Sequence, residues 1–446
     1  MGTSRPGPPA LNPGTPPNAD QPAYCHVGVD LGTSGCRAVA IDDAGRIRAG
    51  ARTRLPPSRR IRNGYSEQRP QDWWSAFQRV LTELLQQDPG KVRSICVDGT
   101  SSTLLLSDSD GVPLNSALMY DDRRAAKQAR QIARIAPIDS PSRGPGSALA
   151  KLLYRLSQLA HHGRCHALHQ ADWIAGRLLG RFDLTDENNA LKLGYDPVAR
   201  CWPQWMERLS IPDGVLPSVQ PIGTVYGAIR RAAAEELGLP HDVTVVAGTT
   251  DSNAAALAAG ITDPGDAVSS LGSTLALKVL SERPLASAQY GIYSHRLGDT
   301  WLVGGASNSG GAVLRRYFEE DEIARRSQSI DPERPLDLHY YPLNSTGERF
   351  PRNDPDLRAR LHPRPTDPTR FLQGLLEGIA DIEAEGYARL AELGAPYPRR
   401  VFSSGGGANN AIWQRMRERR LGVPVTIATQ TEAAYGAARL ARDALA

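Results

Sequence analysis

The stretch VGVDLGTSGCRAVAIDDAG, residues 27–45, places an acid and a turn of glycine and hydroxyl residues between two apolar runs. This pattern predicts a hairpin of two short strands, at 27–31 and 37–41. Turns often contain Gly, Ser and Thr for backbone reasons alone. Asp30, however, lies at the end of an apolar strand, where a carboxylate needs a specific reason. It either caps the turn or faces a cation beside a bound phosphate, and this stretch alone leaves both interpretations open.

The whole chain sets broad limits on function. Its 446 residues are enough for two to three domains. The 52 basic and 48 acidic residues are too balanced to indicate a nucleic-acid or membrane partner. No apolar run approaches the length of about 18 residues that a transmembrane helix needs. Five scattered cysteines suit a reducing compartment, so we expect a cytoplasmic protein.

The hairpin pattern occurs a second time. Residues 266–282, DAVSSLGSTLALKVLSE, again place a Leu-Gly-hydroxyl turn between apolar runs, with Gly272 in the position of Gly32. Because the separation is domain-sized, the repeat predicts two similar domains rather than a short-repeat array. We expect a disordered Pro- and Gly-rich tail at 1–25, followed by an N-terminal domain at 26–260 and a C-terminal domain at 261–446.

Two further glycine-rich clusters also follow predicted strands. One is the Asp-Gly-Thr-Ser run that begins at Asp98, and the other is the triple glycine at 405–407, which precedes a predicted helix. Each half of the chain therefore contains two such elements. This arrangement favours a nucleotide bound in a cleft between two related domains.

Two candidate sites have a plain structural alternative. Asp251 lies where the loop of AGTTDSNAAALAAG meets a predicted helix, so it is either an N-cap or a carboxylate in the cleft. The His- and Cys-containing run HHGRCHALH at 161–169 has metal-ligand residue types, but Gly163 interrupts it and it contains no carboxylate. We therefore interpret this run as a polar helix end rather than a metal site.

Taken together, these motifs resemble the FGGY carbohydrate kinases. The resemblance runs from about residue 26 to the C-terminus and rests on GVDLGTSGCRAVAIDDAG, DGTS, YDDRR, DWIAGRLLG, AGTTDSNAAALAAG, SLGST, GGGANNAIWQRMRERRLGVPV and TEAAYGAARLA. The segments DENNALKLGYDP and GGASNSGGA look most like the short D-ribulose kinases of the family. The chain lacks a Walker phosphate loop and the signature motifs of protein kinases, which excludes those two classes.

The resemblance implies an α/β fold of two ribonuclease H-like, actin-like ATPase domains around a nucleotide and sugar cleft. It implies ATP and Mg²⁺ as cofactors, with Asp251 as catalytic base and Asp30 as a catalytic residue beside both the metal and the sugar. It further places Thr33, Ser34 and Gly35 at the phosphates, Thr33, Ser34 and Ser101 at the sugar, Gly272, Ser273, Gly311, Gly406, Gly407 and Asn410 at the nucleotide, and Trp413 near the base.

The choice of sugar stays open at this point. Larger family members have a Trp-x-Asp-x-Arg pattern, whereas this chain has Tyr120, Asp122 and Arg124. We expect D-ribulose to be preferred, with D-xylulose, L-ribulose or a polyol as alternatives. A non-catalytic ATP-dependent hinge protein is the alternative from another class, because the same architecture serves other roles. The sequence leaves both a monomer and a homodimer possible.

Overall fold

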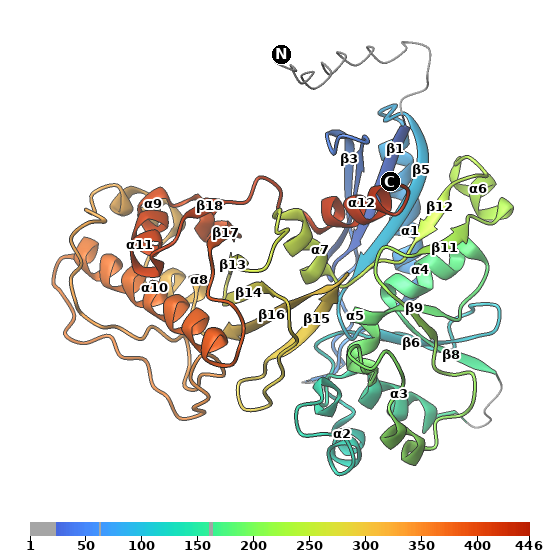
Figure 1. Cartoon of the computed structure of the whole chain (residues 1–446), viewed down its shortest axis with the longest axis horizontal. Coiled ribbons are helices and arrows are strands. Elements are labelled where there is room, and N and C mark those ends of the chain that lie inside the picture. The colour runs from blue at the N-terminus through green and yellow to red at the C-terminus, as the bar shows by residue number, and fades with distance from the viewer. Residues whose placement is uncertain (1–23, 62–63, 160–163) are drawn as a thin grey trace, which may run out of the picture.

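The computed structural model describes residues 24–61, 64–159 and 164–446, which form two α/β domains (Figure 1). Most of the predicted tail, residues 1–23, lies outside the described residues. Its last two residues do not belong to a tail, because strand β1 (Tyr24–Leu31) begins at Tyr24. Cys25 is fully buried and pairs with Val92 of the neighbouring strand, so the domain begins earlier than predicted.

The N-terminal domain contains a six-stranded mixed sheet in the order β11-β12-β5-β1-β2-β3. The predicted hairpin is confirmed, since β1 pairs antiparallel with β2 (Gly35–Ile41), which pairs in turn with β3 (Ile47–Arg54). On its other side β1 pairs in parallel with β5. Helices α1 and α4 are among those that pack against this sheet. Bounds are β5 Lys91–Gly99, β11 Val225–Ala228, β12 Thr244–Val246, α1 Pro70–Leu85, α4 Gln170–Leu179 and α6 Arg231–Leu237.

The C-terminal domain repeats five strands of this arrangement, as the second hairpin predicted, and has its sixth strand at the opposite edge. Its sheet has the order β15-β16-β14-β13-β17-β18. The strands β13 (Asp266–Leu271) and β14 (Leu275–Ser281) form the hairpin, and β13 pairs in parallel with β17. The long helix α10 (Pro368–Glu392) buries an apolar stripe that consists of Leu372, Leu375, Leu376, Ile379 and Ile382. Other bounds are β15 Tyr293–Leu297, β16 Thr300–Ser307, β17 Arg400–Ser404, β18 Val425–Ile427, α8 Gly311–Arg315, α9 Glu320–Ser327 and α11 Ala411–Leu421.

Smaller elements extend the N-terminal domain. A four-stranded sheet has the order β4-β7-β6-β8. It corrects one prediction: Cys165–His169 form strand β8 and not a helix end, and the His169 ring is hydrogen-bonded to Asp172 at 2.9 Å. The described residues contain no group of three or more His, Cys, Asp or Glu that could hold a metal; His161 and His162 lie outside them. Bounds are β4 Glu67–Gln68, β6 Leu104–Asp108, β7 Ala117–Leu118, α2 Ala126–Ala133, α3 Ala148–Leu156, β9 Leu184–Asp186, α5 Glu187–Ala190, β10 Ser218–Gln220 and α7 Asp251–Ala258.

The last helix, α12 (Ala433–Asp443), returns to the N-terminal domain and packs on β1, β5 and α7 (Figure 1). The chain after β18 therefore crosses back to the N-terminal sheet. Small residues make the close approach possible. A Cβ on Gly28 would lie 2.0 Å from the carbonyl oxygen of Ala434, and one on Gly436 would lie 1.9 Å from that of Ala254.

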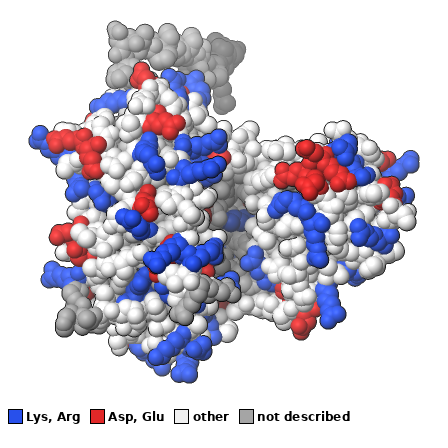
Figure 2. Space-filling view, turned by 180° about the vertical axis from the view of Figure 1, so that it is seen from behind, with Lys and Arg blue, Asp and Glu red and all other residues white. Residues whose placement is uncertain are grey.

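The surface agrees with the balanced charge. Figure 2 shows basic and acidic side chains interspersed over both domains, with a hollow between them. No helix in the described part of the chain is both long enough and apolar enough to cross a bilayer.

We predict that Gly28→Ala destabilises the protein, because the added methyl group forces α12 away from β1. Overpacking of this kind typically costs about 1–3 kcal/mol. Gly144→Ala is the matched control, since a Cβ there meets nothing within 4 Å and its φ is −80°. Thermal unfolding should show a lower midpoint for Gly28→Ala only. Equal midpoints for both variants would contradict the tight contact between α12 and β1.

Candidate active site

Three carboxylates meet where strands of the N-terminal sheet end. Asp30 on β1 lies opposite Asp98 on β5 in the parallel register. The next residue of β5, Gly99, forms a parallel bridge to Thr250, which directly precedes Asp251. Because the carboxyl ends of parallel strands meet at one edge of a sheet, the fold brings together side chains that are far apart in the sequence.

Asp30 and Asp98 are buried with hydrogen-bonding capacity left over. Asp30 is 5% exposed, and only its Oδ2 has a partner, the Arg37 guanidinium at 3.1 Å. Asp98 is fully buried beside Asp30, and no N–H or O–H group of the described residues donates to either of its oxygens. Burial raises the pKa of Asp30, and the interaction with the Asp98 carboxyl and then the Arg37 charge partly oppose this shift. Burial, and then the charges of Asp30 and Asp251, raise the pKa of Asp98 well above its usual value.

Asp251 is the first residue of α7, and the N-cap position belongs to Thr250. The Asp251 carboxylate accepts a hydrogen bond from the amide of Ser252 at 2.6 Å and does not cap the helix by its side chain. Burial, followed by repulsion from Asp30, raises the pKa of Asp251 to about 6. The side chain is therefore mostly ionised at neutral pH yet basic enough to accept a proton.

The turn of the first hairpin is held from several sides. Gly32 donates to the carbonyl of Gly35 at 3.0 Å, and Leu55 donates to the carbonyl of Ser34 at 2.9 Å. The Gln68 amide donates to the carbonyl of Thr33 at 2.8 Å. Ser34 remains exposed, and the turn lies directly after Asp30.

The glycine-rich elements of the C-terminal domain also come together. The amide of Gly311 donates to the carbonyl of Gly272 at 2.9 Å, and Arg315 donates to the Ser273 hydroxyl at 2.8 Å. A Cβ on Gly311 would lie 2.7 Å from Gly272, and one on Gly405 would lie 2.9 Å from the end of β13. The structure therefore joins three predicted nucleotide residues, Gly272, Ser273 and Gly311, to the triple-glycine turn.

The three other predicted nucleotide residues, Gly406, Gly407 and Asn410, have different structural surroundings. A Cβ on Gly406 would meet nothing within 4 Å, so this position is open. Gly407 is required for packing, because a Cβ there would lie 2.5 Å from the Trp413 ring. Asn410 caps α11 by accepting from the amide of Trp413 at 3.0 Å and donates to Ser327 at 2.8 Å. Trp413 itself is 2% exposed beneath the turn, with its indole bonded to Leu376, so it offers no face to a base and that prediction is wrong.

A cavity of about 290 Å³ is lined by Ser252, the residue after Asp251, and by Lys278, Tyr293 and His295, among others, and its lining includes none of the three clustered carboxylates. His295 is 8% exposed, and its Nε2 has no partner. Burial, and then the nearby Lys278 charge, lower the pKa of His295 well below its usual value, so the ring is neutral.

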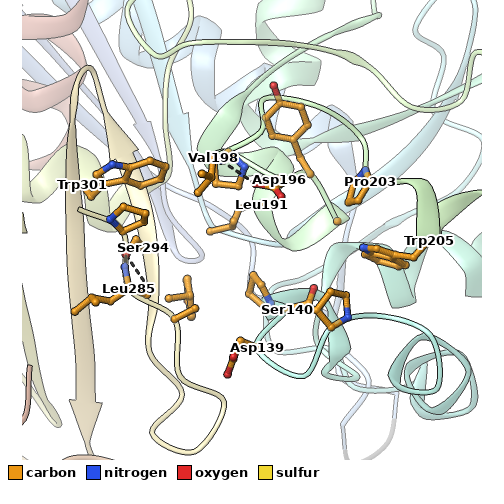
Figure 3. A pocket seen from close by; sticks show the side chains of 18 residues that line it. Asp139, Ser140, Leu191, Asp196, Val198, Pro203, Trp205, Leu285, Ser294 and Trp301 are labelled. Atoms are coloured by element: carbon orange, nitrogen blue, oxygen red, sulfur yellow. Dashed lines mark hydrogen bonds between the residues drawn. The ribbon is translucent and has the colours of Figure 1, made fainter. Parts of the chain in front are cut away.

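A second cavity, of about 300 Å³, lies between the helical part of the N-terminal domain and the loop before β15 (Figure 3). Prolines and aromatic residues line it, including Pro203, Trp205 and Trp301. The two carboxylates in its lining already accept hydrogen bonds within the protein. Asp139 accepts one from the amide of Ala288, and Asp196 accepts one from the amide of Val198. It contains none of the three clustered carboxylates.

Comparison with known proteins fits this geometry. Residues 25–258 match the N-terminal domain of the FGGY family of carbohydrate kinases, and residues 267–445 match its C-terminal domain. The chain belongs to the FGGY family of carbohydrate kinases. The family agrees with the expected class, an ATP-dependent sugar kinase.

The individual relatives have low sequence identity to this FGGY kinase, but the alignments cover most of its length. The xylulose kinase of Escherichia coli K12 is 26% identical over 441 residues, covering 94% of this chain and 90% of the relative. A glycerol kinase of Gloeobacter violaceus is 26% identical over 422 residues, covering 89% and 83%. A crystal structure of a xyloylose kinase from Brucella ovis superposes with a TM-score of 0.84 at 24% identity, covering 94% and 90%. The structural match confirms the expected actin-like two-domain fold.

In this FGGY kinase the structure adds a residue that the sequence did not single out as part of the site, Asp98. The signal was present, because Asp98 begins a cluster that resembles the one after Asp30. Ser101 lies in the turn that follows this strand and is half-buried. Asp122 and Arg124 form a buried ion pair at 2.7 Å, and Arg124 also pairs with Glu67 at 2.6 Å. The charges of Asp122 and Arg124 are therefore already paired with each other and with Glu67.

We predict that Asp98→Asn stabilises the protein at alkaline pH. A carboxyl whose pKa is raised on folding favours the folded state below its unfolded pKa of about 3.9, and this contribution is lost as pH rises through the folded value. Between pH 5 and pH 8, without metal or nucleotide, the unfolding midpoint of the wild type should fall further than that of Asp98→Asn.

The exposed Asp110→Asn is the control for this comparison and should follow the wild type. Thermal scans at both pH values measure the effect. Parallel pH dependence of the wild type and Asp98→Asn would contradict the electrostatic strain assigned to the cluster.

Proposed function

We propose that this FGGY kinase transfers the γ-phosphoryl group of ATP to a hydroxyl of a ketopentose, with D-xylulose as the best-supported substrate. The observation that supports phosphoryl transfer most strongly is the Asp251 carboxylate at the start of α7, with a pKa of about 6, beside Asp30 and Asp98. The substrate follows from several relatives that are named xylulose kinases at about a quarter identity, such as those of Escherichia coli and Bacillus subtilis.

Asp251 acts as the general base in this proposal. A sugar hydroxyl is a weak nucleophile at neutral pH, and a carboxylate in hydrogen-bond reach accepts its proton as the phosphoryl group is transferred.

Asp30 and Asp98 are the residues that would hold Mg²⁺. Three of their four carboxylate oxygens are buried and accept no hydrogen bond from an N–H or O–H group of the described residues, which fits a hard cation that prefers oxygen ligands. Two carboxylates are enough, since Mg²⁺ usually keeps several waters and binds substrate phosphates as well. When bound, the ion neutralises charge on the phosphates. Asp98 thus joins Asp30, the only metal ligand that the sequence suggested.

The two hairpin turns would hold the phosphates from opposite domains. In this proposal, backbone amides and hydroxyls at Thr33 and Ser34 would bind phosphate oxygens from one domain, and the Gly272 and Ser273 amides from the other. Gly35, Gly311 and Gly406 complete this set through backbone that approaches closely. Ser101, beside Asp98, would contact the sugar.

D-ribulose is the second candidate substrate. The segment DENNALKLGYDP favours it by resemblance, whereas the names of the relatives favour D-xylulose. Asp122 and Arg124 do not help to choose, because they bind each other and Glu67. A non-catalytic hinge protein is disfavoured, since nucleotide binding alone does not require a carboxylate at Asp251.

We predict that Asp251→Asn folds normally and loses sugar phosphorylation by about 10²–10⁴-fold in kcat/KM, the usual cost of removing a general base. In the wild type kcat/KM should decline as pH falls below about 6, where Asp251 becomes protonated. ADP release in a coupled assay measures both effects, with the exposed Asp213→Asn as control. Near wild-type turnover by Asp251→Asn would remove this residue from the reaction.

We predict that D-xylulose gives a higher kcat/KM than D-ribulose, L-ribulose or glycerol. A misplaced hydroxyl leaves buried polar groups unpaired, at about 1–3 kcal/mol for each group. The preference should therefore amount to about one to two powers of ten. Initial rates with each sugar at saturating ATP and Mg²⁺ decide the order. A clear preference for D-ribulose would reverse the substrate assignment and leave the kinase assignment intact.

A further inference from the structure

The chain on either side of Asp251 is fastened to the C-terminal domain. Thr249, two residues before Asp251, accepts a hydrogen bond from the Asn188 side chain at 3.0 Å. Ser252, the residue after Asp251, accepts one from Lys278 at its carbonyl oxygen at 2.7 Å. Asp251 is thus bracketed by two polar contacts.

Asn188 forms the first contact as a bridge between domains. Its amide group pairs with the backbone of Arg296, accepting from N–H at 2.9 Å and donating to C=O at 2.9 Å. Arg296 lies in β15, which is the edge strand of the C-terminal sheet. Asn188 therefore satisfies an edge-strand residue in the way a neighbouring strand would, while the same Nδ2 reaches Thr249.

Lys278 forms the second contact directly from the C-terminal sheet. This residue of β14 also donates to the Ser252 hydroxyl and to Oδ1 of Asn253, both at 3.1 Å. All three ammonium donors are therefore directed to the first turn of α7. Burial lowers the pKa of Lys278 to about 8, and the Asp251 charge opposes this shift.

The two contacts are parts of one network, which is buried at Asn188, Thr249 and Asn253 and open to solvent at Ser252. Asn253 donates to the Thr249 hydroxyl at 3.5 Å and so links the Lys278 side of the network to the Asn188 side. Asn188, Thr249 and Asn253 are each at most 1% exposed. Removing one member leaves buried polar groups of the others unpaired, so the network holds one geometry strongly.

The same strand connects this network to the nucleotide side. β14 begins at Leu275, directly after the turn that contains Gly272 and Ser273, and Lys278 lies three residues further along. A paired strand is stiff, and this spacing corresponds to only about 10 Å. A shift of the turn relative to the N-terminal domain is therefore transmitted to Asp251 through Lys278.

We propose that Asn188 and Lys278 are positioning residues that fix the Asp251 carboxylate relative to the phosphate-binding turn of the other domain. The inference rests on the proposed role of Asp251 as general base. It predicts a loss of turnover with little loss of substrate binding, because the residues act through the position of the base. A misplacement of about 1 Å typically costs about 10²-fold in rate.

The test compares Lys278→Met, Lys278→Arg and Asn188→Asp with the wild type, using the best sugar from the substrate panel. Lys278→Met and Asn188→Asp should lower kcat by about 10–100-fold and change the KM for sugar and ATP by less than about 3-fold. Lys278→Arg, which keeps charge and donors, should recover most of the loss. Unfolding midpoints confirm that each variant is folded.

Asp139→Ala is the matched control. It removes another interdomain hydrogen bond, from the amide of Ala288 at 2.6 Å, that does not reach the Asp251 segment. Its kcat should stay within about 2-fold of the wild type. An equal loss in this variant, or a rise in KM that accounts for the loss in Lys278→Met, would overturn the positioning role.

A double mutant separates this inference from the proposed function. If Lys278 acts through Asp251, Lys278→Met should cause no further loss in an Asp251→Asn background. A further tenfold loss there would show that Lys278 acts independently and would overturn the inference. Failure of the proposed function has a different signature, which is an active Asp251→Asn single variant.

Discussion

The proposed active site depends on a fold that holds three carboxylates close together despite their mutual repulsion. Asp30, Asp98 and Asp251 come from three different segments, and the sheet register places them at one edge with few partners. Such a cluster costs stability in the free protein, since burial and mutual repulsion favour protonation. A fold retains this kind of strain where a cation and a proton acceptor are needed, which is the physical basis of the proposed kinase mechanism.

The duplicated hairpin explains why the site lies between two domains. In each half the turn follows the strand that pairs in parallel with a later strand, so each sheet offers a glycine-rich turn at the same edge. The return of α12 to β1 then ties the two ends of the chain into the N-terminal domain. The network of Asn188 and Lys278 adds a polar link between the domains at Asp251.

Local pattern was enough to predict much of this from the sequence. The two hairpins and the candidate residues Asp30 and Asp251 follow from apolar runs that are interrupted by acids and glycines. Asp98 was not singled out because its role depends on the register between β1 and β5, which is a tertiary property. For the same reason the sequence did not show that α12 crosses back or that Trp413 is buried beneath its turn. Asn410 shows that a residue can match a motif and also serve as a helix cap.

The most direct test of the account is a crystal structure of the wild-type protein with a non-hydrolysable ATP analogue, Mg²⁺ and D-xylulose. The account predicts a sugar hydroxyl at about 2.6–3.2 Å from the Asp251 carboxylate, in line with the γ-phosphate. It also predicts Mg²⁺ beside Asp30 and Asp98. A sugar bound away from Asp251, or a metal bound without either of the other two carboxylates, would contradict the account.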